Sequence, residues 1–252
     1  MKDIHFTIKS NTPIASNIFQ MELAADEQLP PIKCGQFLNL EVAGRRDLIL
    51  RRPFCICKFG KNSMTIVYAV VGEGTSALSR LKRDTEIKAV LPLGRGFALT
   101  DSHKKVVLLG GGLGVAPLLP VPKCYPAPEF RAYLGFSNKS TVILEDDFRK
   151  ACGTVTVTTD DGSYGVQGYP TQALQRDIEA GYKPDVILTC GSHNMLKAVA
   201  KFALGHKIPA YASTEARMGC GVGACLVCVC KVDGRYVRVC ANGPVFKLEE
   251  LF

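Results

Sequence analysis

The chain has 252 residues, of which 47% are hydrophobic and 21% are charged, and its formal net charge is +8 at pH 7. This length allows two domains with cores of their own, and the composition is that of an ordinary globular protein rather than a disordered one. Lysines and arginines are scattered and form no basic stripe with interleaved aromatic residues, so we expect no nucleic-acid partner.

The sequence predicts a cytoplasmic protein with no membrane segment. No apolar run reaches the length of about 18 residues that suggests a membrane-spanning helix. The amino-terminal residues lack the apolar stretch of a secretion signal. The 11 cysteines lie mainly in apolar strands or in one dense group near the carboxyl end, which fits a reducing compartment.

Residues 1–101 are typical of a small antiparallel β-barrel. Short alternating or apolar runs are separated by glycine, proline and asparagine. We expect strands at 5–8, 18–23, 37–42 and 63–71, and one helix at 76–82.

Two motifs in this half indicate a cofactor that carries phosphate. Arg52 precedes Pro53, Phe54 and Cys55 at the start of a strand, and a guanidinium can hold phosphate through paired hydrogen bonds. Gly74 and Thr75 open the expected helix, whose amino-terminal N–H groups attract a pyrophosphate. Each motif alone fits a solvated arginine or an ordinary helix start, but their occurrence in one β-domain strengthens both.

In residues 102–212 strands alternate with helices, which predicts a parallel α/β sheet. Apolar runs at 106–109, 130–136, 154–158 and 185–190 are expected to be strands, and helices are expected at 171–180 and 194–204. Prolines are concentrated in 117–128, so the helix after the first strand should be short or distorted.

A glycine-rich turn after the first of these strands predicts a second nucleotide site. Its glycines allow close approach of the backbone to a dinucleotide phosphate, although Pro117 takes the last position of the usual motif. A later strand ends in Cys-Gly, at the sheet edge where ligands of α/β proteins bind. A tight turn without a ligand is the alternative. The candidate residues are Gly111, Gly112, Gly114, Cys190 and Gly191.

Four cysteines within residues 213–252 form the most specific motif. Four residues separate Cys220 from Cys225, two separate Cys225 from Cys228, and eleven separate Cys228 from Cys240. This is the ligand spacing of plant-type [2Fe–2S] clusters. Structural zinc is the main alternative, and Cys230 is an alternative ligand. A segment this short lacks a core of its own, so we expect the cluster to organise it.

Taken in order, these motifs resemble the ferredoxin–NADP reductase superfamily, in which a flavin-binding barrel precedes a nicotinamide-nucleotide domain. The added cysteine motif narrows the resemblance to the electron-transfer subunits of class B dihydroorotate dehydrogenase. Supporting stretches lie at 50–53, 160–165, 195–198, 215–218 and 243–246, and the resemblance covers essentially the whole chain.

The resemblance implies FAD and a [2Fe–2S] cluster as cofactors and NAD+ as electron acceptor. It assigns the cluster to the four cysteines above. It also implies an FMN-containing catalytic subunit that oxidises dihydroorotate to orotate in pyrimidine biosynthesis, two copies of each subunit in a heterotetramer, and no catalytic side chain in this chain. The residues assigned to FAD are Arg52, Pro53, Phe54, Cys55, Val67, Tyr68, Ala69, Gly74 and Thr75.

Four positions, and the proline-rich stretch 117–128, depart from the family pattern. Cys55 stands where relatives generally have serine, Ala69 where many have a basic residue, and Ser192 with His193 replaces the familiar residues after Cys-Gly. The choice between NAD and NADP is open. Two alternatives remain: a diaphorase-type subunit of a bifurcating ferredoxin:NADP reductase or a sulfhydrogenase, and a zinc-stabilised interaction protein without enzymatic activity.

Overall fold

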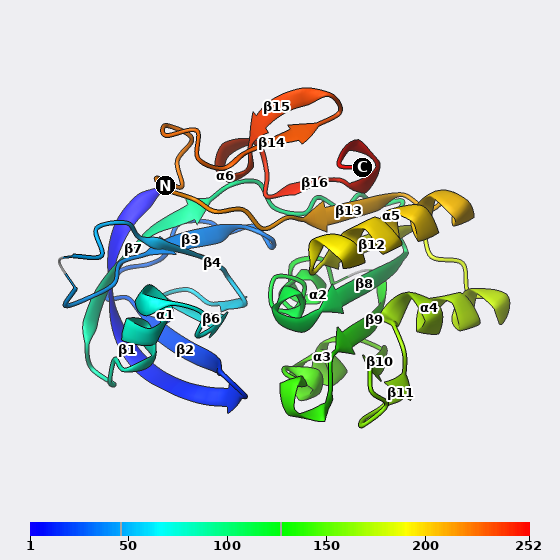
Figure 1. Cartoon of the computed structure of the whole chain (residues 1–252), viewed down its shortest axis with the longest axis horizontal. Helices are drawn as coiled ribbons and strands as arrows, with labels where there is room; N and C mark the ends of the chain where they lie inside the picture. The colour runs from blue at the N-terminus through cyan, green and yellow to red at the C-terminus, as the bar shows by residue number, and fades with distance from the viewer. Residues whose placement is uncertain (46, 127) are drawn as a thin grey trace.

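The computed structural model describes residues 1–45, 47–126 and 128–252. Figure 1 shows an amino-terminal β-rich half beside an α/β half, with the carboxyl-terminal segment lying across the top of both. The expected fold class is confirmed: an antiparallel barrel-like sheet, a parallel sheet with helices, and a small carboxyl-terminal segment. The boundaries expected at 101/102 and 212/213 stay predictions.

The first half contains seven antiparallel strands and one helix among the described residues. Side chains at every second position of the first strand, such as Ile4, Phe6 and Ile8, are buried because strand residues alternate between faces. The elements are β1 (Lys2–Ala15), β2 (Ile18–Ala24), β3 (Phe37–Leu40), β4 (Arg52–Cys55), β5 (Lys58–Phe59), β6 (Ser63–Ala69), α1 (Glu73–Ser79) and β7 (Glu86–Leu93). Their sheet order is β4-β3-β7-β1-β2-β6-β5. The expected helix is present but begins earlier, at Glu73.

The second half is built on a mainly parallel sheet. Its strands are β8 (Lys105–Gly111), β9 (Glu129–Phe136), β10 (Thr154–Thr159), β11 (Val166–Gln167), β12 (Val186–Cys190) and β13 (Ala210–Ser213), and β16 (Val245–Lys247) joins them. The sheet order is β11-β10-β9-β8-β12-β13-β16. The helices are η1 (Gly112–Val115), α2 (Val121–Cys124), η2 (Lys139–Thr141), α3 (Glu145–Ala151), α4 (Pro170–Glu179) and α5 (His193–His206). As the prolines predicted, the helical turns after β8 are short.

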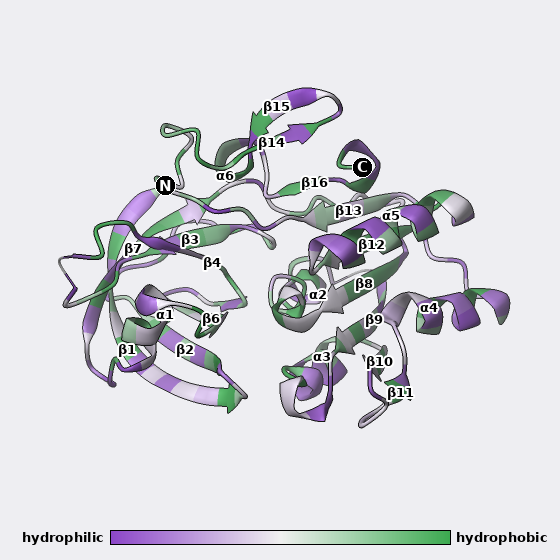
Figure 2. Cartoon of the chain, in the orientation of Figure 1, coloured by the Kyte–Doolittle hydropathy of each residue, from purple (hydrophilic) through white to green (hydrophobic). Residues whose placement is uncertain are grey.

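Helices cover both faces of the parallel sheet, which explains the continuous apolar run of β8. Val106 and Leu108 pack in the core that includes η1 and α3, whereas Val107 and Leu109 pack against α4 and α5. Both sets of side chains are therefore removed from water, and strands buried on both faces lack polar alternation. In Figure 2 the central strand β8 is largely green, while α4 carries purple segments.

The carboxyl-terminal segment is tied to both halves. It contains β14 (Val229–Val232), β15 (Arg235–Arg238), α6 (Val239–Asn242) and η3 (Leu248–Glu250), and its strand β16 pairs antiparallel with β13. Phe37 and Leu93 of the barrel share a buried core with Cys228 and Cys240. In the described part of the chain, no helix is long and apolar enough to cross a membrane.

Candidate cofactor sites

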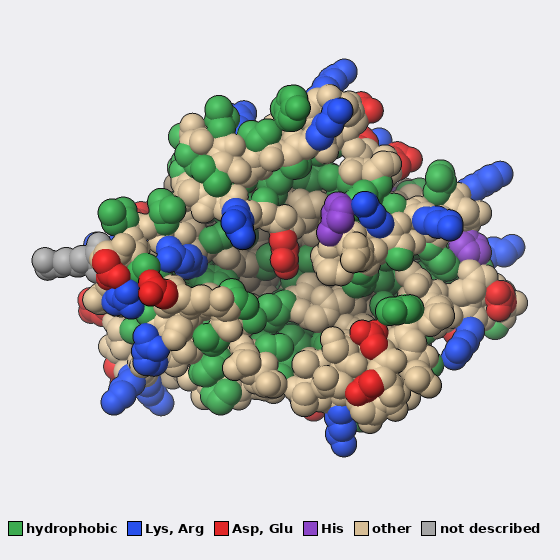
Figure 3. Space-filling view, viewed as in Figure 1, with side chains coloured by type: hydrophobic (Ala, Val, Ile, Leu, Met, Phe, Trp, Pro, Cys, Tyr) green, Lys and Arg blue, Asp and Glu red, His purple; other side chains and the backbone are tan. Residues whose placement is uncertain are grey.

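A cleft of about 390 Å³ lies between the barrel and the parallel sheet. The space-filling view shows a hollow between these halves, with hydrophobic side chains gathered around it (Figure 3). A volume in this range suits a small-molecule or cofactor site. The cleft is lined by Phe37, Arg52, Pro53, Phe54, Cys55, Val67, Tyr68, Ala69, Val71, Thr75, Leu113, Ala116, Thr214, Glu215, Ala216, Met218 and Pro244.

The cleft brings together eight of the nine residues that the sequence assigned to FAD. The ninth, Gly74, lies directly behind Arg52: a Cβ atom at position 74 would stand 2.4 Å from Arg52 Nε. The neighbouring Arg51 instead makes a two-bond ion pair with Asp3, at 2.8 Å for each bond. Of the two adjacent arginines, only Arg52 therefore presents its guanidinium to the cleft.

The aromatic and hydroxyl groups around the cleft are held by other parts of the barrel. The Tyr68 hydroxyl donates to Asn11 Oδ1 at 2.8 Å, and the Tyr68 ring lies 5.5 Å from that of Phe54. Thr75 Oγ1 accepts hydrogen bonds from the N–H groups of Val71 and Gly72, at 2.9 and 3.1 Å. Apolar rings with one cation and few polar groups fit a planar ring system that carries phosphate.

Cys55 and Glu215 line this cleft, and the buried thiol of Cys190 lies near enough to both for their charges to affect it. Burial, with a smaller contribution from the Glu215 carboxylate, raises the pKa of Cys55 to about 12. Burial likewise raises the pKa of Cys190 well above its usual value. Glu215 is accessible to solvent inside the cleft, but protein surrounds its carboxyl group on most sides and raises its pKa. Cys55 therefore presents a neutral thiol to a bound ring.

The two glycine turns meet at the carboxyl ends of β8 and β12, next to the cleft. A Cβ at Gly114 would stand 2.3 Å from the Cys190 carbonyl oxygen, and Cβ atoms at Gly111 and Gly191 would collide with Met195 Sδ. The rigid backbone at Cys190 therefore explains Gly114 without a ligand, whereas the contacts of Gly111 and Gly191 are with a flexible side chain. Gly112 differs, because it has a φ of 55° and nothing within 4 Å of its Cβ position.

The carboxyl-terminal cysteine loop turns backbone N–H groups toward sulfur. Cys220 Sγ accepts hydrogen bonds from Val222, Ala224 and Cys225 at 3.3 to 3.4 Å. Burial acts to raise the pKa of Cys220, but these N–H groups lower it to about 6. Gly221 and Gly223 have φ values of 73° and 87°, a conformation that glycine adopts readily. The loop is thus built to stabilise a thiolate.

The four cysteines form two neighbouring pairs, Cys220 with Cys225 and Cys228 with Cys240. Cys220 N–H donates to Cys225 Sγ at 3.3 Å, and Cys240 N–H donates to Cys228 Sγ at 3.4 Å. Burial and the neighbouring Cys228 thiol raise the pKa of Cys240 to about 12, so iron binding must release its proton. Within the described residues, no three His, Cys, Asp or Glu side chains are placed to hold one metal ion. Two thiol pairs fit a cluster with two irons and four cysteine ligands.

Comparison with known proteins gives the family. Residues 215–252 match the iron-sulfur cluster binding domain of dihydroorotate dehydrogenase B. The chain is 42% identical over 250 residues to the electron transfer subunit of dihydroorotate dehydrogenase B (NAD(+)) from Streptococcus thermophilus, covering 95% of each chain. The corresponding subunit from Bacillus velezensis is 39% identical over 260 residues, which cover 100% of this chain and 99% of that one. The chain belongs to the family of dihydroorotate dehydrogenase B electron transfer subunits.

Solved structures of other reductases share the fold. The structure of an NADH-dependent reduced ferredoxin-NADP oxidoreductase, studied for flavin-based electron bifurcation, aligns with a TM-score of 0.87 at 25% identity over 98% of this chain and 89% of that one. Phthalate dioxygenase reductase shares the fold, with a TM-score of 0.68, 18% identity and coverage of 92% and 88%. The family resemblance expected from the sequence is confirmed.

Several residues that line the cleft were not predicted from the sequence to lie at a cofactor site. The stretch 215–218 supported the family resemblance, but its place in the cleft was not expected. Pro244 likewise belongs to the supporting stretch 243–246, and Phe37 and Val71 lie at the ends of expected strands, but none of the three was assigned to a cofactor. Leu113 and Ala116 line the cleft, whereas the neighbouring glycines proposed for nicotinamide binding do not.

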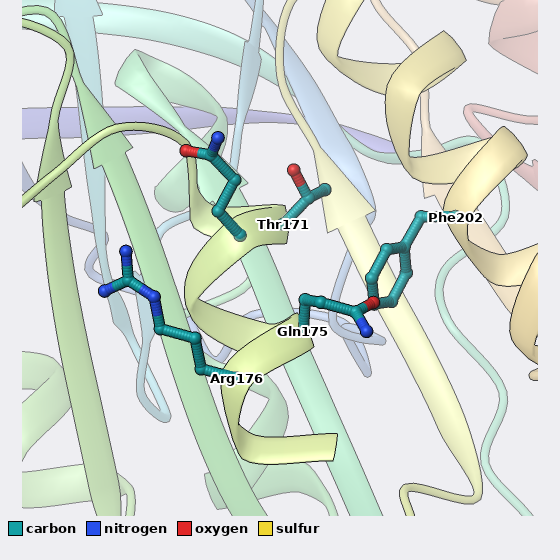
Figure 4. A pocket seen from close by; sticks show the side chains of 5 residues that line it. Thr171, Gln175, Arg176 and Phe202 are labelled. Atoms are coloured by element: carbon teal, nitrogen blue, oxygen red, sulfur yellow. The ribbon is translucent and has the colours of Figure 1, made fainter. Parts of the chain in front are cut away.

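A second cavity, of about 410 Å³, lies away from both sites on α4 and α5. Its lining residues are Thr171, Gln172, Gln175, Arg176 and Phe202. In Figure 4, the Gln175 side chain extends from α4 to the side of the helix on which Phe202 is drawn, while Arg176 points to the other side of α4. These side chains do not converge on one point, so the cavity does not compete with the cleft as a cofactor site.

Proposed function

We propose that this chain is the electron-transfer subunit of an NAD-dependent dihydroorotate dehydrogenase, linking an FMN-containing catalytic subunit to NAD+ in pyrimidine biosynthesis. In this proposal two copies of each subunit form a heterotetramer. The observation that carries it is the shared wall between the two sites: Phe37 lines the cleft and also packs in the core that contains Cys228 and Cys240. A cleft and a cysteine loop that share one strand suit electron transfer between two bound cofactors.

The residues present fit these cofactors. Arg52 would bind the FAD pyrophosphate with Gly74 and Thr75, while Phe54, Cys55, Val67, Tyr68 and Ala69 would lie along the ring. Cys220, Cys225, Cys228 and Cys240 would bind the [2Fe–2S] cluster. Bound FAD and the cluster supply the chemistry, which joins single-electron transfer at the cluster to hydride transfer to NAD+. The chain's own side chains orient these groups and limit water access.

Nicotinamide binding is proposed at the edge where Gly111, Gly112, Gly114, Cys190 and Gly191 meet. Its support is positional, because ligands of parallel α/β sheets bind beyond the carboxyl ends of the strands. Gly112 is the residue with open space around it. The other four bring the turns into contact, so their proposed role is to shape the site.

An apolar surface beside the cysteine loop supports docking of the catalytic subunit there. Val222, Leu226 and Val227 are 44%, 61% and 58% exposed, although all three are apolar. Apolar side chains that gather on a surface commonly mark a protein interface. A partner bound here would lie next to the cysteines, where an electron can enter the chain.

The test is to purify the tagged chain from its native cells and identify its stoichiometric partners by mass spectrometry. We expect an FMN-containing dihydroorotate dehydrogenase subunit, FAD, two irons per chain, and orotate formation that depends on NAD+. A hydrogenase-like or larger iron-sulfur partner would contradict the proposed pathway. The fold similarity to the bifurcating oxidoreductase supports that diaphorase-type alternative. The sequence identity to that oxidoreductase is 25%, however, whereas the identity to the dihydroorotate dehydrogenase relative is 42%, which favours the dihydroorotate dehydrogenase function.

A further inference from the structure

Asn39 is a buried polar residue that connects the flavin-binding barrel to the cysteine loop. It lies in β3 and is only 3% exposed. In the sheet it pairs with Pro53 of β4, one of the residues proposed to hold FAD. Its Nδ2 group donates a hydrogen bond of 3.2 Å to the carbonyl oxygen of Cys220. One side chain therefore joins the strand beside the proposed flavin site to the first proposed cluster ligand.

The cysteine loop packs directly against this amide. Gly221 has a φ of 73°, and a Cβ atom there would stand 2.8 Å from Asn39 Nδ2. The hydrogen bond fixes the peptide between Cys220 and Gly221, where the loop begins. The following N–H groups donate to Cys220 Sγ, so the orientation of this first peptide sets the direction from which they approach sulfur.

Asparagine at position 39 lowers the stability of the fold relative to an apolar residue. Its Oδ1 atom is buried and has no hydrogen-bond partner. A buried acceptor without a partner opposes folding because it loses its bonds with water, whereas an apolar side chain of similar size avoids that loss. Leucine would fill this part of the barrel, so the value of asparagine at this position lies in the hydrogen bond to Cys220.

We propose that Asn39 is a positioning residue for electron transfer: it anchors the cluster loop to the flavin-binding barrel through the Cys220 carbonyl. This inference rests on the proposed function, because it requires a [2Fe–2S] cluster on Cys220. Hydrogen bonds to the sulfurs are among the factors that set the reduction potential of such clusters. Loss of the anchor frees the first peptide and weakens the N–H bonds to Cys220 Sγ, which moves the potential to a more negative value.

The experiment compares Asn39→Leu with the wild-type chain in the complex with its catalytic subunit. Measurements are the EPR spectrum of the reduced cluster, its midpoint potential, iron release to a chelator, FAD content and the thermal midpoint. We expect iron release about 10-fold faster, as for the loss of other groups that orient metal ligands. We also expect an altered EPR spectrum, a more negative potential, full FAD content and an unchanged or higher thermal midpoint.

Gln36→Leu is the matched control. Gln36 precedes the same strand, and its Nε2 group donates to a backbone carbonyl, that of Gly94, at 2.8 Å, so it offers the same type of bond away from Cys220. This variant should keep the wild-type spectrum and potential. Asn39→Val is the second test variant, since an apolar side chain that suits a strand has no donor for the Cys220 carbonyl and should also give a more negative potential.

The outcomes separate the inference from the proposed function. A wild-type complex without iron would overturn the proposed function, and the role of Asn39 with it. An iron-loaded wild type whose Asn39 variants keep its EPR spectrum, potential and iron-release rate would overturn the inference alone. Parallel loss of FAD, cluster and thermal stability in both Asn39 variants would also overturn it, because that pattern indicates a purely structural residue.

Discussion

The cleft and the cysteine loop are assembled in different ways. The loop takes three of its four cysteines from nine consecutive residues, and its own backbone N–H groups surround Cys220 Sγ. The cleft instead combines β3, β4, β6, the turn after β8 and the segment after β13, which are far apart in the chain. A site built from one short segment can be recognised from spacing, whereas a site built from distant segments requires the fold.

Replacement of one loop cysteine should give the largest effect, the loss of the cluster. This effect should be confined to the loop and should spare FAD binding in the cleft. Cys225→Ser is expected to abolish the EPR signal of the reduced cluster, because serine replaces a thiolate ligand, while most FAD stays bound. EPR and flavin absorbance of the purified complex measure both quantities. Cys230→Ser is the control, since Cys230 lies in β14 outside the four-cysteine set. An unchanged spectrum for Cys225→Ser would contradict the ligand assignment.

The adjacent arginines of the cleft strand offer a second contrast. Arg52→Ala should raise the dissociation constant of FAD about 10- to 100-fold, the effect of losing a hydrogen bond to a charged group. Arg51→Ala should leave FAD affinity near that of the wild type, because Arg51 is bound to Asp3. Titration of apoprotein with FAD, followed by flavin fluorescence, measures both constants. Equal losses for the two variants would show that Arg52 has no special role.

Two glycines at the amino-terminal end of α1, Gly72 and Gly74, allow a steric test of the FAD site. Gly74→Ala places a methyl group against the Arg52 guanidinium and should weaken FAD binding on the order of 10-fold, the usual size of an overpacking effect. Gly72→Ala is the control, since nothing lies within 4 Å of its Cβ position and its φ of −172° suits any residue. The same FAD titration measures both. Wild-type affinity in Gly74→Ala would mean that Arg52 can move without loss.

The smallest effect is expected at Cys55. Cys55→Ser should keep FAD bound and change its affinity by less than about 3-fold, because a neutral thiol is replaced by a slightly better hydrogen-bond donor. The pKa of Cys55 is raised to about 12, so the thiol stays protonated between pH 6 and 9. The pH profile of FAD binding in that range should therefore be the same for both proteins. Complete loss of FAD from Cys55→Ser would show another role for this thiol.

Much of the architecture could be read from local sequence. The continuous apolar run of β8 predicted a strand buried on both faces, and the two helix layers of the structure account for it. The prolines of 117–128 predicted the short helical turns after that strand. The Arg-Pro-x-Cys and Gly-x-Gly-Thr motifs predicted residues that the structure brings to one cleft or, for Gly74, directly behind it.

The remaining features depended on tertiary structure. Arg51 and Arg52 are chemically identical neighbours, and the fold places Arg51 against Asp3, 48 residues away, and Arg52 at the cleft. The sequence showed glycine-rich turns at Gly111, Gly114 and Gly191, and only the fold shows that they pack against Met195 and the Cys190 carbonyl. No motif marked Asn39, because its partner Cys220 is 181 residues away.

The sequence by itself therefore determined the cysteine spacing, the order of β and α/β segments and the family. These features depend on contacts between residues that are close in the chain, where geometry follows from residue type. The tertiary structure decided which arginine enters the cleft, how the glycine turns pack, and that β3 forms the wall between the two sites. Such features depend on contacts between distant segments, which exist only once both sheets and the carboxyl-terminal segment are packed together.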